Sequence, residues 1–237
     1  MIKSNKIICA LDLPDLEDIK RLVYSIEYDI LYKFGMEFFY NFGMKGIEEV
    51  KKIKPNCKIF LDLKLHDIPN TVKRSIPPLL KKINPDILTI HASGGRKMIE
   101  EAVKITNETS LELDIKRPLL IGVTILTSLS QGDLIEMGLN EKLENYVLNY
   151  AKLSKNSGLD GIVCSALETR NVKKKLGNNF KIITPGIRIL NSNNQDQARV
   201  VTPKEAFNNG SDYIVMGRAL ISAEEPNKVI EKIISEV

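Results

Sequence analysis

The 237-residue chain has no long apolar run, and this absence narrows its class at once. No stretch approaches the roughly 20 apolar residues that a membrane-spanning helix needs. The first residues lead into an apolar strand pattern without the hydrophobic centre of a signal peptide. We therefore expect a cytoplasmic protein that has no membrane partner.

Cysteine is scarce, and its spacing excludes two further classes. Cys9, Cys57 and Cys164 are far apart and odd in number, and none belongs to a Cys-x-x-Cys or Cys/His pattern. This spacing argues against a disulfide framework and against a zinc site. Cys9 and Cys164 lie in apolar segments, so we expect them to be small buried residues. His66 and His91 share no metal-ligand spacing, and we expect both to be structural.

Positive charge is in slight excess only. A net charge of +4 is compatible with an anionic substrate but is too diffuse to indicate nucleic acid. The lysine clusters at 51–52, 81–82 and 173–175 occupy helical positions and lack the interleaved aromatic residues that stack on bases. We expect them to be solvated helix faces, with no nucleic-acid partner.

Short apolar segments alternate with amphipathic helical patterns along the whole chain. The eight expected strands are 7–11, 30–33, 59–66, 86–90, 119–124, 161–164, 181–184 and 213–216. Strands that alternate with helices predict a parallel sheet. Eight such units without a linker predict an α/β fold, a single (β/α)₈ TIM barrel that forms one catalytic domain over residues 1–237. The alternative is an open doubly wound sheet, but the first strand lacks the Gly-x-Gly-x-x-Gly turn of its dinucleotide-binding version.

The segment Ile59–Thr71 contains a strand pattern with charged residues on one side. Alternation places Ile59, Leu61, Leu63 and Leu65 on one face, and Phe60, Asp62, Lys64 and His66 on the other. In isolation, the simplest interpretation is a half-exposed strand with its polar face in water. In a barrel the apolar face meets the helices, so Asp62 and Lys64 point inward, about 6.6 Å apart along the strand. Charges there must be paired, which suggests a function. The helix that follows contains Pro77-Pro78, which we expect to break or kink it.

The candidate site residues lie at or just after the carboxyl ends of the predicted strands, where barrels of this type have their active sites. They are Asp12, Lys33, Asp62, Lys64, Asp67, Thr127, Arg188, Gly217 and Arg218. Arg188 and Arg218 closely follow glycines after the last two strands, which is the usual phosphate-binding place of this fold. The polar loop 191–199 is long enough to close over a phosphate, with Gln197 as a candidate contact.

The motifs together resemble those of bacterial orotidine 5′-phosphate decarboxylases. The resemblance covers essentially the whole chain and rests on Asp-Leu-Lys-Leu-His-Asp-Ile-Pro-Asn-Thr, Ala-Leu-Asp, Lys-Phe-Gly-Met-Glu, Thr-Pro-Gly-Ile-Arg, Asp-Gln-Ala-Arg and Met-Gly-Arg. It implies decarboxylation of orotidine 5′-monophosphate to UMP and CO2, the last step of de novo UMP biosynthesis, without a metal or organic cofactor.

The resemblance also implies roles for individual residues. Asp62 would lie against the C6 carboxylate, Lys64 would donate the proton to C6, Lys33 would pair with Asp62 and contact the ribose, and Asp12 would bind a ribose hydroxyl. These lysines and Asp62 would form a charge network with Asp67.

The remaining implied roles concern the partner subunit and the rest of the nucleotide. Asp67 and Thr71 would reach the ribose of the neighbouring subunit's ligand, which implies a homodimer with shared active sites. Thr127 would lie beside the pyrimidine, and the phosphate would contact Arg188, Gln197, Gly217 and Arg218.

The chemistry of these residue types agrees with this reaction. Loss of CO2 leaves an electron pair on C6, and an inward ammonium group between carboxylates both stabilises that charge and delivers a proton. One alternative is a magnesium-dependent keto-sugar-phosphate lyase of the same superfamily. It would need an acidic ligand where this chain has Lys33, although Glu37 is near. The other is a non-catalytic nucleotide-binding paralogue, which would have lost a lysine or aspartate of the core motif.

Overall fold

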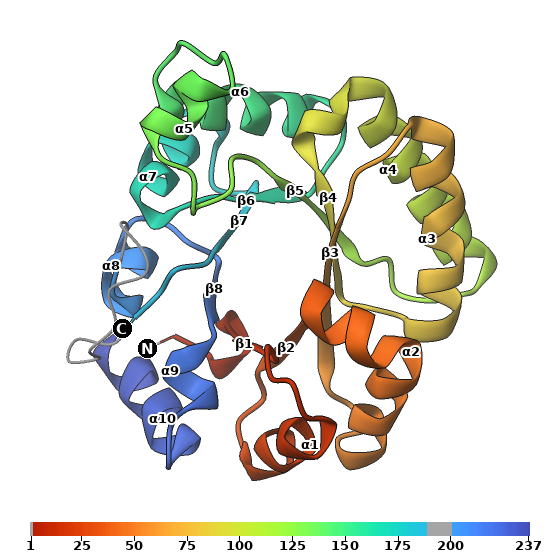
Figure 1. Cartoon of the computed structure of the whole chain (residues 1–237), viewed down its shortest axis with the longest axis vertical. Helices are drawn as coiled ribbons and strands as arrows, with labels where there is room; N and C mark the ends of the chain where they lie inside the picture. The colour runs from red at the N-terminus through yellow and green to blue at the C-terminus, as the bar shows by residue number, and fades with distance from the viewer. Residues whose placement is uncertain (1, 189–200) are drawn as a thin grey trace.

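Eight parallel strands close into a barrel in the computed structural model, which describes residues 2–188 and 201–237 (Figure 1). Each strand pairs with the next, and β8 pairs with β1. The strands are β1 (Ile7–Ala10), β2 (Leu31–Phe34), β3 (Lys58–Leu65), β4 (Ile87–His91), β5 (Leu119–Val123), β6 (Gly161–Val163), β7 (Lys181–Thr184) and β8 (Tyr213–Met216). Their ends lie within one residue of the expected ones, and the predicted (β/α)₈ barrel is confirmed.

Helices surround the barrel on its outside (Figure 1). They are α1 (Leu16–Ser25), α2 (Met36–Ile53), α3 (Pro69–Ile83), α4 (Gly95–Glu112), α5 (Gln131–Glu136), α6 (Leu143–Asn156), α7 (Ala166–Leu176), α8 (Pro203–Asn208), α9 (Arg218–Ile221) and α10 (Pro226–Glu236), with short 3-10 turns η1 (Ser4–Lys6) and η2 (Ala92–Gly94). Among the described residues, none of the helices combines the length and apolar character required to cross a membrane.

Helix α3 runs without interruption through Pro77 and Pro78, so the expected break is wrong. Each proline leaves the carbonyl four residues earlier without its helical N–H donor. These carbonyls belong to Lys73 and Arg74, which are half-buried and exposed, so water can take the place of the missing donors. The amphipathic pattern of the helix, which buries Val72, Ile76 and Leu80 against the barrel, then outweighs the two lost bonds.

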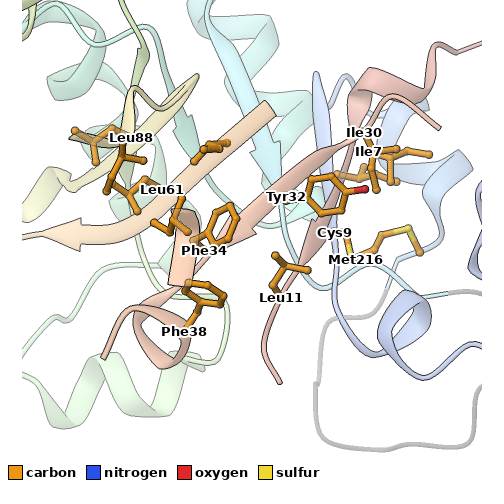
Figure 2. Close-up of a cluster of buried hydrophobic side chains, with 14 of the residues drawn as sticks. Ile7, Cys9, Leu11, Ile30, Tyr32, Phe34, Phe38, Leu61, Leu88 and Met216 are labelled. Atoms are coloured by element: carbon orange, nitrogen blue, oxygen red, sulfur yellow. The ribbon is translucent and has the colours of Figure 1, made fainter. Parts of the chain in front are cut away.

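Alternation along the strands produces two apolar layers. On the outer face, side chains such as Cys9, Tyr32 and Phe34 pack between the strands and the helices (Figure 2). On the inner face, one residue from each of several strands fills the barrel: Ile8, Leu31, Phe60, Ile87, Ile121 and Ile183. Cys9 and Cys164 are fully buried, as predicted, and burial raises the pKa of each thiol to about 12.

An aspartate precedes each of the strands β4, β6 and β8 and ties it to the strand before. The carboxylates of Asp86, Asp160 and Asp212 accept the backbone N–H groups of Ile59, Leu120 and Ile182, at 2.8, 2.8 and 2.9 Å. These acceptors lie at the amino-terminal end of the barrel, away from the expected active site, so their role is to hold the strands together.

Two lysines of the expected solvated clusters are not fully solvated: Lys173, and Lys51, which is half-buried and donates from Nζ to the Ile83 carbonyl at 2.6 Å. The side chain of Lys173 is only 11% exposed, and its Nζ atom lies 2.6 Å from the Asp212 carboxylate. The expectation is therefore wrong for Lys173, whereas Lys174 and Lys175 are exposed. Helical spacing alone did not separate the lysine that turns toward the barrel from its two neighbours.

Candidate active site

A cavity of about 720 Å³ opens at the carboxyl ends of the strands. Its floor is the inner apolar layer, including Phe60, Ile183 and Val215. Eight of the residues singled out in the sequence line its walls: Asp12, Lys33, Asp62, Lys64, Thr127, Arg188, Gly217 and Arg218. The barrel thus brings together side chains from both ends of the chain, because parallel strands present all their carboxyl ends on one side.

Four of these side chains form a row of alternating charge. Lys33 Nζ lies 3.1 Å from Asp12 Oδ1 and 3.7 Å from Asp62 Oδ2, and Lys64 Nζ lies 2.8 Å from the same Asp62 oxygen. Lys33 and Asp62 are the deepest pair, with side chains 11% and 10% exposed. Each buried charge therefore has an opposite charge beside it, as burial requires.

Strand β3 reaches this arrangement by leaving the regular ladder. Phe60 and Leu61 pair with Ile87 and Leu88, but the next pair is Leu65 with Ile90. The three residues 62–64 therefore face a single residue of β4, and Lys64 adopts a left-handed backbone with φ of 50°. The bulge interrupts the ladder but keeps the predicted faces: Asp62 and Lys64 line the cavity, while Leu63 and Leu65 pack against the outer apolar cluster.

The β4 residue opposite the bulge is Thr89, which was not among the residues predicted for the site. Thr89 is fully buried, donates a hydrogen bond from Oγ1 to Asp62 Oδ1 at 2.9 Å, and accepts one from the Lys64 backbone N–H at 2.9 Å. In the sequence it is one β-branched residue within an apolar strand, which is ordinary strand composition. Its position on the inward face of the strand beside Asp62 is the signal that would have identified it.

The two arginines come from the C-terminal part of the sequence but line the same cavity. Arg188 follows the turn after β7, where Gly186 has a φ of 76°, and its backbone N–H donates to the Val201 carbonyl at 3.1 Å. Arg218 is the first residue of α9, directly after Gly217. The cavity therefore has positive charge at the ends of β7 and β8, where this fold usually binds phosphate. Gln197 lies outside the described residues.

Asp67 and Thr71 lie apart from the cavity lining in this single chain. Both are exposed, and Asp67 accepts the backbone N–H of Ile68 at 2.7 Å. Within residues 2–188 and 201–237, the row of ion pairs begins with Asp12 beside Lys33 and ends at Lys64, so it does not include Asp67, which the predicted network contained. The contribution of Asp67 and Thr71 to a neighbouring subunit stays a prediction.

The histidines form a pair at the rim. The rings of His66 and His91 have centroids 5.0 Å apart. His66 is exposed and His91 is half-buried at the end of β4. Burial lowers the pKa of His91, and the neighbouring His66 and Lys64 lower it further, against the opposing effect of Asp62.

Comparisons with known proteins agree with this geometry. A sequence profile described as orotidine 5′-phosphate decarboxylase / HUMPS family matches residues 5–233. A protein named orotidine 5′-phosphate decarboxylase from Wolbachia sp. subsp. Brugia malayi (strain TRS) is 46% identical over 234 residues, which are 98% of this chain and 99% of that protein. One of the same name from Bacillus cereus (strain G9842) is 44% identical over 94% of this chain and 93% of its own.

A solved structure points the same way. The crystal structure of orotidine 5′-phosphate decarboxylase from Lactobacillus acidophilus superposes with a TM-score of 0.82 at 36% identity, and the match covers 98% of each chain. The profile match, the two relatives and this structure each span nearly the whole barrel. The chain therefore belongs to the orotidine 5′-phosphate decarboxylase / HUMPS family.

Proposed function

We propose that the chain decarboxylates orotidine 5′-monophosphate to UMP and CO2 without a cofactor. The observation that carries this proposal is the row Asp12–Lys33–Asp62–Lys64, which ends in an ammonium group inside a cavity that also contains two arginines. The relatives at 44–46% identity support it by their names, whereas the profile description spans more than one group of enzymes.

The proposed chemistry takes place at C6 of the pyrimidine. The carbon–carbon bond to the carboxylate breaks, its electron pair stays on C6, and CO2 leaves. The Lys64 ammonium group then gives C6 a proton, and the row of preorganised charges stabilises the electron pair before the transfer. Asp62 holds Lys64 in place through its 2.8 Å ion pair and would lie against the substrate carboxylate. Lys33 and Asp12 would bind the ribose hydroxyls.

The phosphate is assigned to the side of the cavity formed by Arg188, Gly217 and Arg218. A guanidinium group offers two parallel N–H donors to phosphate oxygens, and a glycine lets the backbone come close. Thr127, in the loop after β5, would lie on the pyrimidine side. Binding energy from the phosphate, which is remote from C6, would help to order and dehydrate the reacting end. Gln197 is assigned to the phosphate by the resemblance alone.

The functional unit is proposed to be a cytoplasmic homodimer with shared active sites. Asp67 and Thr71 are exposed at the start of α3, beside the strongly exposed Ile68, so they are accessible to a second copy of the chain. Each would contact the ribose of the ligand in the neighbouring subunit.

A spectroscopic assay of orotidine 5′-monophosphate conversion, run on the wild type and on Lys64→Ala, tests the function. We expect the variant to fold and bind UMP but to have almost no turnover, because it lacks the proton donor. Lys82→Ala, which removes an exposed lysine of α3, is the matched control and should keep full activity. Near-normal turnover in Lys64→Ala would exclude the assigned role of Lys64, and an inactive wild type would exclude the proposed reaction.

The same assay separates the magnesium-dependent alternative. Lys33 occupies the end of β2 and already pairs with Asp12 and Asp62, while Glu37 is exposed and lies outside the cavity lining. A cation at this place would meet the Lys33 ammonium group. Full turnover in excess chelator is therefore the expected result, and loss of turnover that magnesium restores would favour the lyase.

A further inference from the structure

One side chain of the neighbouring strand, Thr89, hydrogen-bonds to both Asp62 and Lys64 of the strand bulge. We propose that Thr89 is a positioning residue for the decarboxylation, because its hydroxyl group fixes the Asp62 carboxylate and the Lys64 backbone relative to each other. This inference rests on the proposed function and adds a residue to it that touches neither substrate nor the reacting atoms.

The hydroxyl group takes the place of a missing backbone hydrogen bond between β3 and β4. Between the pairs Leu61–Leu88 and Leu65–Ile90 the ladder has three residues on β3 and only Thr89 on β4. The Lys64 N–H group, which a regular parallel ladder would give to a backbone carbonyl, donates to Thr89 Oγ1 at 2.9 Å. Because Lys64 has a φ of 50°, which L-residues adopt sparingly, this bond helps to hold the backbone in that conformation.

The same hydroxyl group orients the carboxylate. Thr89 donates to Asp62 Oδ1, which leaves Oδ2 to face Lys64 Nζ at 2.8 Å and Lys33 Nζ at 3.7 Å. A carboxylate held at one oxygen only is free to turn about its last side-chain torsion, which is a soft one. Thr89 therefore fixes which oxygen faces the two ammonium groups, and with it the place of the Lys64 proton.

Threonine meets the requirements of this site where other residues of similar size do not. Thr89 is fully buried, so water does not reach this position to replace the two hydrogen bonds of the hydroxyl group in a variant that lacks it. Valine has the same shape but neither donates nor accepts, and serine keeps the hydroxyl group while it loses one methyl group. The three side chains thus separate the hydrogen bonds from the packing.

The test compares Thr89→Val, Thr89→Ser and Thr89→Ala with the wild type in steady-state assays of orotidine 5′-monophosphate. We expect Thr89→Val to lower kcat by roughly 10- to 100-fold, the effect of losing a hydrogen bond to a charged group. The KM should stay within about threefold, because the phosphate and ribose contacts are intact. Thr89→Ser should recover most of the kcat. If the protein does not accommodate valine at this position, Thr89→Ala serves as the variant without a hydroxyl group, to be compared with Thr89→Ser. Circular dichroism checks that each variant folds.

Three results would overturn the inference while leaving the proposed function in place. They are a kcat of Thr89→Val close to that of an active wild type, a serine variant as impaired as the alanine variant, and a change confined to KM. A merely structural role would lower the melting temperature without this kcat-specific loss and serine rescue. An inactive wild type would overturn the proposed function together with the inference that rests on it.

Discussion

Gly35 lies so close to Lys33 that a Cβ atom at position 35 would be 2.8 Å from the Lys33 Nζ atom. It would also be 3.3 Å from Asp12 Oδ1. The backbone at Gly35 has φ of −85° and ψ of −173°, an extended conformation that any residue adopts. The glycine is therefore required for space beside the ion pair and not for its conformational freedom.

We predict that Gly35→Ala lowers kcat/KM by roughly 10- to 100-fold, because it displaces the Lys33 ammonium group from between Asp12 and Asp62 by a fraction of an ångström. The melting temperature should change little, since the end of a flexible side chain moves more easily than the backbone. Gly132→Ala in α5 is the control: its nearest neighbour would be Ser130 Oγ at 3.5 Å, an ordinary contact away from the cavity. Equal activity of the two variants would contradict the prediction.

At the other end of the barrel, Asp212 should matter for stability and not for turnover. Its carboxylate accepts from Lys173 Nζ at 2.6 Å, from Lys181 Nζ at 3.2 Å and from the Ile182 N–H at 2.9 Å, and its side chain is 15% exposed. Asp212→Ala leaves the Lys173 ammonium group, which is 11% exposed, with only the Asn178 and Phe180 carbonyls and no opposite charge, and it removes the side-chain acceptor of the Ile182 N–H group. We expect the free energy of unfolding to fall by about 2–4 kcal/mol, with kcat unchanged, as measured by urea denaturation and the activity assay.

The matched control for this variant is Glu49→Ala. Glu49 also pairs with a lysine, Lys52, at 2.5 Å, but on the outside of α2 where both groups face water. Exposed pairs of this kind contribute little to stability. Its unfolding midpoint should match that of the wild type. Comparable losses in the two variants would mean that the position of Asp212 at the barrel end has no special importance.

The sequence was sufficient to predict the barrel and its cavity, because the apolar strand segments and the charged residues at their ends can both be recognised within short stretches of the chain. Short apolar segments located each strand to within one residue, and the place of Asp12, Lys33 and Asp62 at strand ends then located the cavity. Helix α5 was not anticipated, although Ser130 and Asp133 form a capping box at its start. Six residues contain too few apolar positions for a helical period to stand out.

The parts of the site that the sequence did not reveal depend on pairing between strands. The bulge in β3 is invisible in the alternation of Ile59–Leu65, because it arises only when Asp62 and Lys64 meet Thr89 of β4. The burial of Lys173 likewise depends on Asp212, which is 39 residues away along the chain. Contacts of this kind follow from the fold, so a pattern within one segment does not contain them.

The pH dependence of stability should reveal the environment of His91. Its ordinary pKa is 6.5, and burial, followed by His66 and Lys64, lowers its pKa in the folded chain, with Asp62 opposing. Below pH 6.5 the unfolded chain therefore binds a proton that the folded chain refuses, so stability falls as the pH drops through 6.5 toward the lowered value. Between about pH 7.5 and 5.5 the melting temperature of the wild type should fall more steeply than that of His91→Gln.

His66→Gln is the control that separates the effect of burial on the His91 pKa from the effect of the neighbouring histidine. It removes the contribution of His66, which is smaller than that of burial, and leaves the burial of His91 in place, so most of the steep fall should persist. Parallel melting curves for the wild type and His91→Gln would show that His91 takes up its proton equally in the folded and unfolded chains.

A shared active site predicts that two inactive variants restore each other. Lys64→Ala removes a group from a subunit's own site, whereas Asp67→Ala would remove a group from the neighbour's site. In a hybrid dimer one site then has both changes and the other has neither. Mixing equal amounts with subunit exchange should return about a quarter of the wild-type activity, since half of the dimers are hybrids with one intact site.

The arrangement of the chain makes this complementation a discriminating test. Asp67 is exposed and bonds to the Ile68 backbone, while Lys64 lines the cavity beside Asp62. If Asp67 served its own subunit, each subunit of a hybrid dimer would have one substitution in its own site. Both sites would then be inactive, and the mixture would stay inactive. A mixture of Lys64→Ala with Asp62→Ala, two residues of one cavity, is the control that should never recover, because each subunit then has a defect in its own site.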